Sequence, residues 1–266
     1  MDRERFVQEI DDIGFTVHQD AFDKREIEEI NQWAAEFNPE RGHTKALKWW
    51  GWQQLEEKIA KGENIRDIDW AYYWTAEPQG NHYIDNVIKP KLGECADAAF
   101  GENNWEWYMC DFICLYPGMN FVRPHIDTPY RFKEFKYTEG LLGLQFMVML
   151  CDFTPDNGAT GYVPGTHKYT YDYYQNMYAD SSHFDIFFQD NYKQHVAPAG
   201  SFVCWHPRVM HSSMPNHSDT IRRGLLLHAA EKTTARRLRI IDPQKMGLAT
   251  VSNISRKLMN KTYSCR

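Results

Sequence analysis

Residues 141–165, LLGLQFMVMLCDFTPDNGATGYVPG, alternate short apolar runs with residues that form turns. The first run ends at Pro155-Asp156-Asn157-Gly158, and the TGYVPG segment after it ends at Pro164-Gly165. Many short strands at fairly even spacing are typical of a barrel or a double-sheet jelly roll. We therefore expect a mainly β core with covering α-helices. The neighbouring strand-like runs are WEWYMCDFICLY at 105–116, FVRPHID at 121–127, SFVCWH at 201–206, RVMHSS at 208–213 and IRRGLLLHAA at 221–230.

The chain before residue 105 has a different pattern, with apolar residues at helical spacing. Between Arg3 and Phe37 this spacing predicts helices interrupted by a short extended piece, GFTV at 14–17. Further helices are expected over 46–61 and 84–100. No linker or internal repeat separates the sections, so we expect one domain. Its parts are a helical N-terminal cover at about 1–100, a β core at 105–232 and a polar tail at 233–266.

The composition is that of a soluble globular protein. Of the 266 residues, 42% are apolar and 25% are charged, which excludes a disordered or collagen-like chain. The formal net charge of -6 gives no global electrostatic reason to bind nucleic acid or an acidic membrane. We therefore expect neither as a partner.

The N-terminal sequence and the cysteines indicate the compartment. MDRERFVQEIDD is charged where a signal peptide would need an apolar region, and no apolar run approaches the roughly 20 residues that cross a bilayer. The six cysteines form no Cys-x-x-Cys pair and are expected to be free thiols. These features favour a cytoplasmic protein.

Four His-x-Asp pairs are candidates for a metal site. Residues two apart on a strand point to the same face, so such a pair can present an imidazole and a carboxylate to one ion. Because the pattern alone is unspecific, its surroundings must decide between the pairs. The four pairs are His18-Asp20, His125-Asp127, His183-Asp185 and His217-Asp219.

Three of these pairs have a simpler interpretation. Asp20 lies between helical segments and fits a turn or helix cap. Residues 183–185 lie in an expected loop, and residues 217–219 follow Pro215-Asn216 in what we expect to be a hairpin loop. His125-Asp127 begins a strand-like stretch upstream of several further strands, from which other ligands can converge on it. We therefore favour this pair.

A third ligand must come from another part of the chain. Two histidines and one carboxylate on one face leave open positions at non-haem Fe(II) for substrate and oxygen. The candidates in the late strands are His206, His211 and His228. His206 precedes Pro207 at an expected strand end and fits a structural role better.

The position of Arg222 favours His211. Arg222 follows His211 by 11 residues, across the turn MPNHSDT at 214–220. Two strands joined by such a turn are expected to be antiparallel neighbours, which would bring Arg222 beside His211. Its guanidinium offers a bidentate fork to a carboxylate, and Ser213 would share the face of His211 and add a hydroxyl.

Four segments, in this order, resemble the phytanoyl-CoA dioxygenase family of Fe(II)- and 2-oxoglutarate-dependent oxygenases. Together they span about residues 14 to 230. The segments are GFTVHQDAFDKREIEEINQWAAEF at 14–37, HID at 125–127, NGATGYVPGTHK at 157–168, and WHPRVMHSS at 205–213 followed by Arg222.

The resemblance implies a double-stranded β-helix, which is a cupin-like jelly roll, and a specific site. His125, Asp127 and His211 would hold Fe(II). 2-Oxoglutarate would chelate the iron while its far carboxylate pairs with Arg222 and Ser213. Gln145, on the strand before the NG signature, is a further expected contact. The turn residues of that signature make it mainly architectural, so His167 and Lys168 are not expected to be ligands.

The resemblance also implies a reaction with O2 that releases succinate and CO2. Related halogenases have a small residue in place of the carboxylate ligand, whereas this chain keeps Asp127, which favours hydroxylation of a C–H bond in a small-molecule metabolite. Aromatic and basic residues of the cover and beyond Asp127 would suit a carboxylated or phosphorylated metabolite, or an acyl group on a carrier. They would equally suit packing and a solvated face. These residues are Trp49, Trp50, Trp52, Trp70, Tyr72, Tyr73, Trp74, Arg131, Lys133 and Lys136.

The sequence argues against two other classes of function. A nucleic-acid oxygenase with the same iron centre would need a basic groove, and the net charge of -6 argues against it. A jelly-roll binding module without catalysis would have no physical reason to keep His125, Asp127, His211 and Arg222 together.

Overall fold

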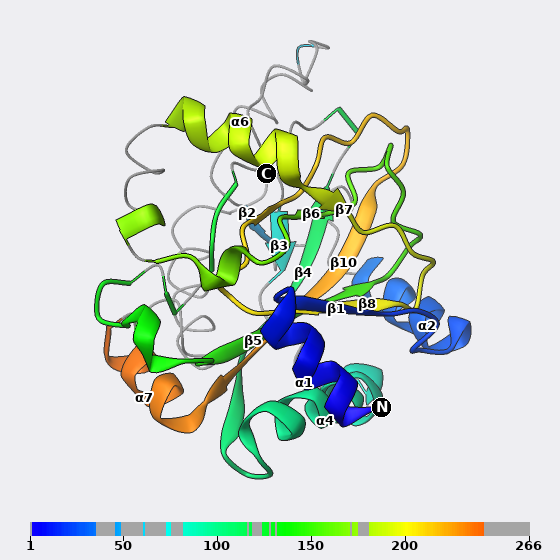
Figure 1. Ribbon diagram of the computed structural model, residues 1–266. Helices are drawn as coiled ribbons and strands as arrows, with labels where there is room; N and C mark the ends of the chain where they lie inside the picture. The colour runs from blue at the N-terminus through cyan, green and yellow to red at the C-terminus, as the bar shows by residue number, and fades with distance from the viewer. Residues whose placement is uncertain are drawn as a thin grey trace.

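Two antiparallel sheets form the centre of the molecule (Figure 1). The computed structural model describes residues 2–35, 46–48, 61, 73–75, 82–115, 117–118, 124–127, 129–130, 132–170, 172–174 and 181–241. The larger sheet has seven strands in the order β1-β8-β5-β10-β4-β3-β2, and the smaller has three in the order β7-β6-β9. The strands are β1 (Phe15–His18), β2 (Ala46–Lys48), β3 (Tyr73–Thr75), β4 (Trp105–Leu115), β5 (Gly143–Met149), β6 (Gly161–Tyr162), β7 (Lys193–Gln194), β8 (Phe202–Trp205), β9 (His211–Ser212) and β10 (Arg222–Glu231).

The larger sheet is buried on both faces around β5 and β10. Alternate residues of these strands point to opposite faces. On one face, Met147 and Leu226 pack in the cluster that also contains residues of the smaller sheet. On the other, Phe146 and Leu225 pack against helices. The first face is therefore the interior between the two sheets.

Helices α1 (Arg3–Asp12), α2 (Lys24–Ala35) and α4 (Lys89–Phe100) cover the outer face. Phe6 and Ile10, one turn apart on α1, are buried there, and the Asp2 side chain caps the helix by accepting from the Arg5 amide at 3.1 Å. A short π-helix, η3 (Ile84–Ile88), leads directly into α4. In Figure 1, α1 and α4 lie together below the strands. None of the helices in the described ranges combines the length and apolar character that a membrane crossing requires.

The expected boundary between cover and core is wrong in detail. Strands β1, β2 and β3 belong to the larger sheet although they come from the first 100 residues. The helix expected over 46–61 begins instead as β2, which pairs with β3, and residues 49–60 lie outside the described part. The backbone N–H and C=O groups of strands near the edge of the sheet need hydrogen-bond partners. This requirement outweighs the helical spacing of the apolar residues in the segment.

Two further elements differ from the sequence-based expectations. His183 and Asp185 lie in α6 (Ser181–Asn191) rather than in a loop, and Phe188 of this helix is buried and stacks on Tyr192 with ring centroids 5.3 Å apart. Helix α7 (Lys232–Ile241) occupies the start of the expected tail. Its Ala235 and Leu238 are buried in a shared apolar cluster. Tertiary packing decides α6, whose local pattern is weak, whereas α7 is amphipathic and buries its apolar face.

Strands β9 and β10 are not the expected antiparallel neighbours. β9 belongs to the smaller sheet and β10 to the larger, so residues 213–221 connect two sheets and do not close a hairpin. The Asn216 side chain fixes this crossing by donating to the carbonyls of Leu115 and Thr220, each at 2.9 Å. Arg222 and Ser213 nevertheless meet, because the two sheets face each other across the interior.

Gly158 is required where the chain enters the smaller sheet. Its φ is +83°, and a Cβ there would overlap the Leu115 side chain and the Met214 carbonyl. Left-handed strain and overpacking each cost about 1–3 kcal/mol. Gly158→Ala should therefore lower the free energy of unfolding in urea by about 3 kcal/mol. Gly165→Ala is the matched control, with φ +78° and nothing within 4 Å of its Cβ. It should cost only the strain, and equal losses would contradict the overlap argument.

Candidate metal centre

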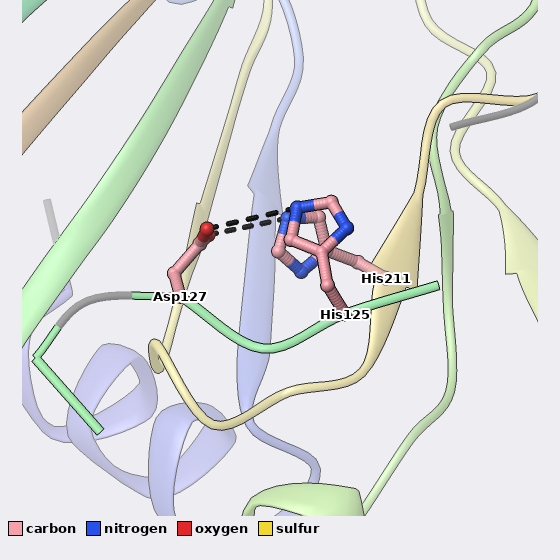
Figure 2. Close-up of side chains that lie close together, drawn as sticks. All are labelled: His125, Asp127 and His211. Atoms are coloured by element: carbon pink, nitrogen blue, oxygen red, sulfur yellow. Dashed lines mark ion pairs between the residues drawn. The ribbon is translucent and has the colours of Figure 1, made fainter. Parts of the chain in front are cut away.

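His125, Asp127 and His211 lie together at one end of the interior (Figure 2). One ligand atom from each residue lies within 4.8 Å of the others. Nε2 of His211 is 3.2 Å from Oδ2 of Asp127, and Nε2 of His125 is 3.7 Å from Oδ1. Among the described residues, this is the one group of three or more His, Cys, Asp or Glu side chains with such geometry.

Backbone hydrogen bonds hold the two chain segments in register. His125 and His211 form an isolated antiparallel bridge in which each amide donates to the other's carbonyl at 3.0 Å. The Asp127 amide donates to the Pro207 carbonyl at 2.7 Å. The favoured His-x-Asp pair thus faces the favoured third histidine.

The His211 ring is oriented by its neighbours. Its Nδ1 lies 3.0 Å from the Val209 carbonyl, so a proton on Nδ1 donates there and leaves Nε2 directed at Asp127. The ring stacks on Tyr162, with centroids 5.6 Å apart and planes at 18°, and packs against Trp205 at 5.3 Å. These contacts fix the orientation of the imidazole, as a metal ligand requires.

Asp127 is held as an anion. Burial acts to raise the pKa of this carboxyl, but the His211 charge and hydrogen bond, with smaller effects from His125 and His228, hold the pKa well below its usual range. The Trp205 indole also donates to Oδ2 at 3.3 Å. The site therefore presents one negative ligand and two imidazoles.

His125 is the more exposed of the two imidazole ligands. Its side chain is 32% exposed, against 8% for His211.

Metal binding should release a proton at moderately acidic pH. Burial acts to lower the His211 pKa, but the Asp127 charge and hydrogen bond outweigh it and raise the pKa above 6.5. Metal needs neutral imidazole, so affinity for Mn(II) should fall about tenfold per pH unit below the folded pKa. Calorimetry in buffers of different ionisation enthalpy measures the affinity and the proton release together. A pH-independent affinity would contradict the His211–Asp127 ion pair.

The same ion pair should make the stability of the metal-free protein depend on pH. The raised pKa of His211 contributes stabilisation that is complete below the unfolded pKa of about 6.5 and is lost as the pH rises through the folded pKa. The free energy of unfolding without metal should decrease over that interval. A denaturant titration at several pH values checks the direction, and an increase would contradict it.

Arg222 lies in the interior beside Ser213, as expected. It is fully buried, and its guanidinium donates from Nη2 to the Ser213 hydroxyl at 3.2 Å. Nη1 donates to the Gly158 carbonyl at 2.7 Å and to the Thr160 hydroxyl at 3.2 Å. A buried cation surrounded by hydroxyls suits a carboxylate.

Gln145 belongs to a row of side chains on the interior face. It is fully buried and pairs in register with Trp205 on β8 and His228 on β10. Tyr108 extends the row through a 3.0 Å hydrogen bond to Nδ1 of His228. Because Trp205 bonds Asp127, this row begins at the metal centre.

The remaining histidine candidates lie elsewhere or have structural roles. His206 is buried, and its Nδ1 accepts from the Arg208 amide at 3.0 Å, in agreement with the structural role expected for it. Nε2 of His167 lies 2.8 Å from the Asp11 carbonyl, and His18 stacks on Phe202. His217 and Asp219 are exposed.

Three residues that line the interior near the centre were not predicted from the sequence. They are Thr160, Tyr162 and Trp205. Thr160 and Tyr162 lie within the NG signature, which was interpreted only as turn chemistry. They are two residues apart, so extended backbone places them on one face, and this parity was a usable signal. Trp205 precedes His206 at a strand end, and no local pattern distinguishes its bond to Asp127 from core packing.

Comparison of the chain with known proteins identifies its family. Residues 10–224 match the family model of phytanoyl-CoA dioxygenase (PhyH), and the chain belongs to this family. A curated relative, dioxygenase cdmD from Talaromyces verruculosus, is 30% identical over 160 aligned residues, and the match covers 57% of this chain and 49% of the relative. The chain thus covers about half the length of that relative.

Solved structures confirm the double-stranded β-helix. The non-heme alpha ketoglutarate dependent epimerase SnoN from nogalamycin biosynthesis has a TM-score of 0.62 at 16% identity, covering 86% of this chain and 82% of its own. SnoN has also been solved with Fe3+, alpha ketoglutarate and nogalamycin RO, with a TM-score of 0.62, 16% identity and coverages of 86% and 83%. The carbocyclase SnoK has a TM-score of 0.61 at 17% identity, with coverages of 86% and 83%. At this identity the likeness establishes the fold.

Proposed function

We propose that this chain is an Fe(II)- and 2-oxoglutarate-dependent dioxygenase that hydroxylates a C–H bond of a small-molecule metabolite and releases succinate and CO2. The observation that carries the proposal is the close grouping of two imidazoles and one carboxylate, with their ligand atoms within 4.8 Å. This donor set is typical of non-haem Fe(II) oxygenases. Family membership and the iron and alpha ketoglutarate in SnoN support it.

His125, Asp127 and His211 are the proposed iron ligands. Iron bound there would supply the activation of O2. The protein's part is to fix the ligands. Val209 orients His211, Trp205 holds Asp127, and the His125–His211 bridge sets the spacing. Asp127 fills the third protein position, which leaves no room for halide and supports oxygen transfer to the substrate.

Arg222 and Ser213 are the proposed partners of the far carboxylate of 2-oxoglutarate, and Gln145 is proposed to line the co-substrate's site. The buried guanidinium provides the charge that a dicarboxylate requires, and the Ser213 hydroxyl lies beside it. The place of Gln145 in the row that begins at Trp205 supports its assignment.

The proposed substrate is small and the proposed location is cytoplasmic. SnoN has been solved with nogalamycin RO, a small molecule, while the net charge of -6 here disfavours a nucleic-acid substrate. The five described cysteines are free thiols, which fits a reducing compartment.

Turnover with isotopic oxygen tests the proposal. Protein loaded with Fe(II) is incubated with 2-oxoglutarate, 18O2 and pools of metabolites, and succinate is measured together with product masses. We expect iron-dependent succinate, stimulated by a metabolite that gains one labelled oxygen atom. Asp219→Ala, which alters an exposed His-x-Asp pair, should behave as wild type. A product without added oxygen would contradict hydroxylation, and the absence of succinate with every pool would contradict the enzyme assignment.

A further inference from the structure

Tyr162 stacks on the proposed iron ligand His211 and lies two residues after Thr160, whose hydroxyl accepts from Arg222. It is the last residue of β6, is fully buried, and pairs in register with His211. Its ring packs against His211, Trp205 and Phe15, with centroid separations of 5.6, 5.5 and 5.5 Å. The ring is therefore fixed on several sides, and so is the position of its hydroxyl.

The hydroxyl of Tyr162 is buried and makes no hydrogen bond to the described residues. The Thr160 side chain lies near enough to lower its pKa slightly, but the geometry falls short of a hydrogen bond, and the Thr160 hydroxyl already accepts from Arg222. A buried phenol without a partner costs free energy that a bound acceptor would recover.

Burial and two charged residues determine the pKa of the Tyr162 phenol. Burial raises the pKa of Tyr162, the Arg222 guanidinium lowers it, and the Asp127 carboxylate raises it to a smaller extent. The phenol therefore keeps its proton and can donate.

We propose that Tyr162 is a further 2-oxoglutarate-binding residue, whose hydroxyl donates to the far carboxylate beside Arg222 and Ser213. This inference rests on the proposed function, and its evidence is the buried hydroxyl without a described partner on a ring that stacks on His211. The Tyr162 hydroxyl would thus increase the affinity for 2-oxoglutarate, in addition to the packing of the Tyr162 ring.

Tyr162→Phe removes only the hydroxyl oxygen. Calorimetry measures the Kd for 2-oxoglutarate in anaerobic titrations of the Mn(II)-loaded protein. This Kd should rise about tenfold, which is the loss of affinity expected when a hydrogen bond to a charged group is removed. The Mn(II) affinity should not change. The thermal midpoint of the ligand-free variant should equal or exceed that of wild type, because no protein hydrogen bond is lost.

Tyr174→Phe is the matched control. Tyr174 is also fully buried, but its hydroxyl donates to the Thr166 and Arg208 carbonyls at 2.6 and 2.7 Å. This variant should lose stability and keep the wild-type Kd for 2-oxoglutarate. An unchanged Kd in Tyr162→Phe would overturn the inference alone. Failure of the wild-type protein to bind 2-oxoglutarate would overturn the proposed function, and the inference with it.

Discussion

Asp127→Ala is expected to abolish iron binding and turnover. The substitution removes the one negative ligand and leaves two imidazoles, of which His125 is partly exposed. Loss of partners outside the ligand shell already costs about 10–100-fold in metal affinity, so loss of a ligand should cost more than about 100-fold. Anaerobic competition against a chromophoric chelator measures the Fe(II) affinity, and succinate release measures turnover.

The controls for this prediction separate ligand loss from misfolding. Asp127→Asn keeps an acceptor for the Trp205 indole but removes the charge, so it should fold and still lose iron. Asp20→Ala and Asp219→Ala alter exposed aspartates of other His-x-Asp pairs and should retain iron. Asp185→Ala, on α6, should retain it as well. Iron loss in any of these three, with wild-type affinity in Asp127→Ala, would mean that another pair holds the metal.

Arg222→Ala should raise the KM for 2-oxoglutarate by about 30-fold or more while the Fe(II) affinity changes little. Truncating one partner of a buried, hydrogen-bonded charge pair costs about 2–5 kcal/mol, and 1.4 kcal/mol is a factor of ten in affinity. Arg222 is fully buried, so bulk solvent cannot replace the guanidinium. Initial rates of succinate formation against 2-oxoglutarate concentration give the KM, and chelator competition gives the iron affinity.

Arg223→Ala is the matched control for Arg222. Neighbouring residues of β10 point to opposite faces, and Arg223 is only partly buried. Its removal should leave the KM unchanged. Arg222→Lys keeps the charge but loses the bidentate guanidinium, so it should give an intermediate KM. This variant also controls for a folding defect in Arg222→Ala, which loses the hydrogen bond to the Gly158 carbonyl. A raised KM in Arg223→Ala alone would place the anchor on the other face.

The β core could be predicted because its signals are local. Apolar runs bounded by turn residues identify β5, β8 and β10, and Pro164-Gly165 correctly ends the short strand β6. His125, Asp127 and His211 could be chosen because the parity of a strand and the chemistry of a metal ligand restrict the candidates. The structure brings these three side chains together.

The pairing of distant segments could not be predicted from local sequence signals. A turn between 213 and 221 has the same residues whether it closes a hairpin or crosses between sheets, so the relation of β9 to β10 was predicted wrongly. The meeting of Arg222 with Ser213 depends on how the two sheets face each other. The hydroxyl of Tyr162 likewise lacks a described partner only because of what the fold places around it. Such features depend on long-range packing, and local spacing does not encode them.

Anaerobic titration of metal-free protein with Fe(II) and then 2-oxoglutarate tests whether His125, Asp127 and His211 hold iron to which 2-oxoglutarate binds. Chelation of iron by 2-oxoglutarate gives a weak visible charge-transfer band. We expect the band to appear at one equivalent of each in wild-type protein and to be absent in Asp127→Ala. Folded wild-type protein that neither holds iron nor develops the band would contradict the proposed oxygenase and favour a binding module without catalysis.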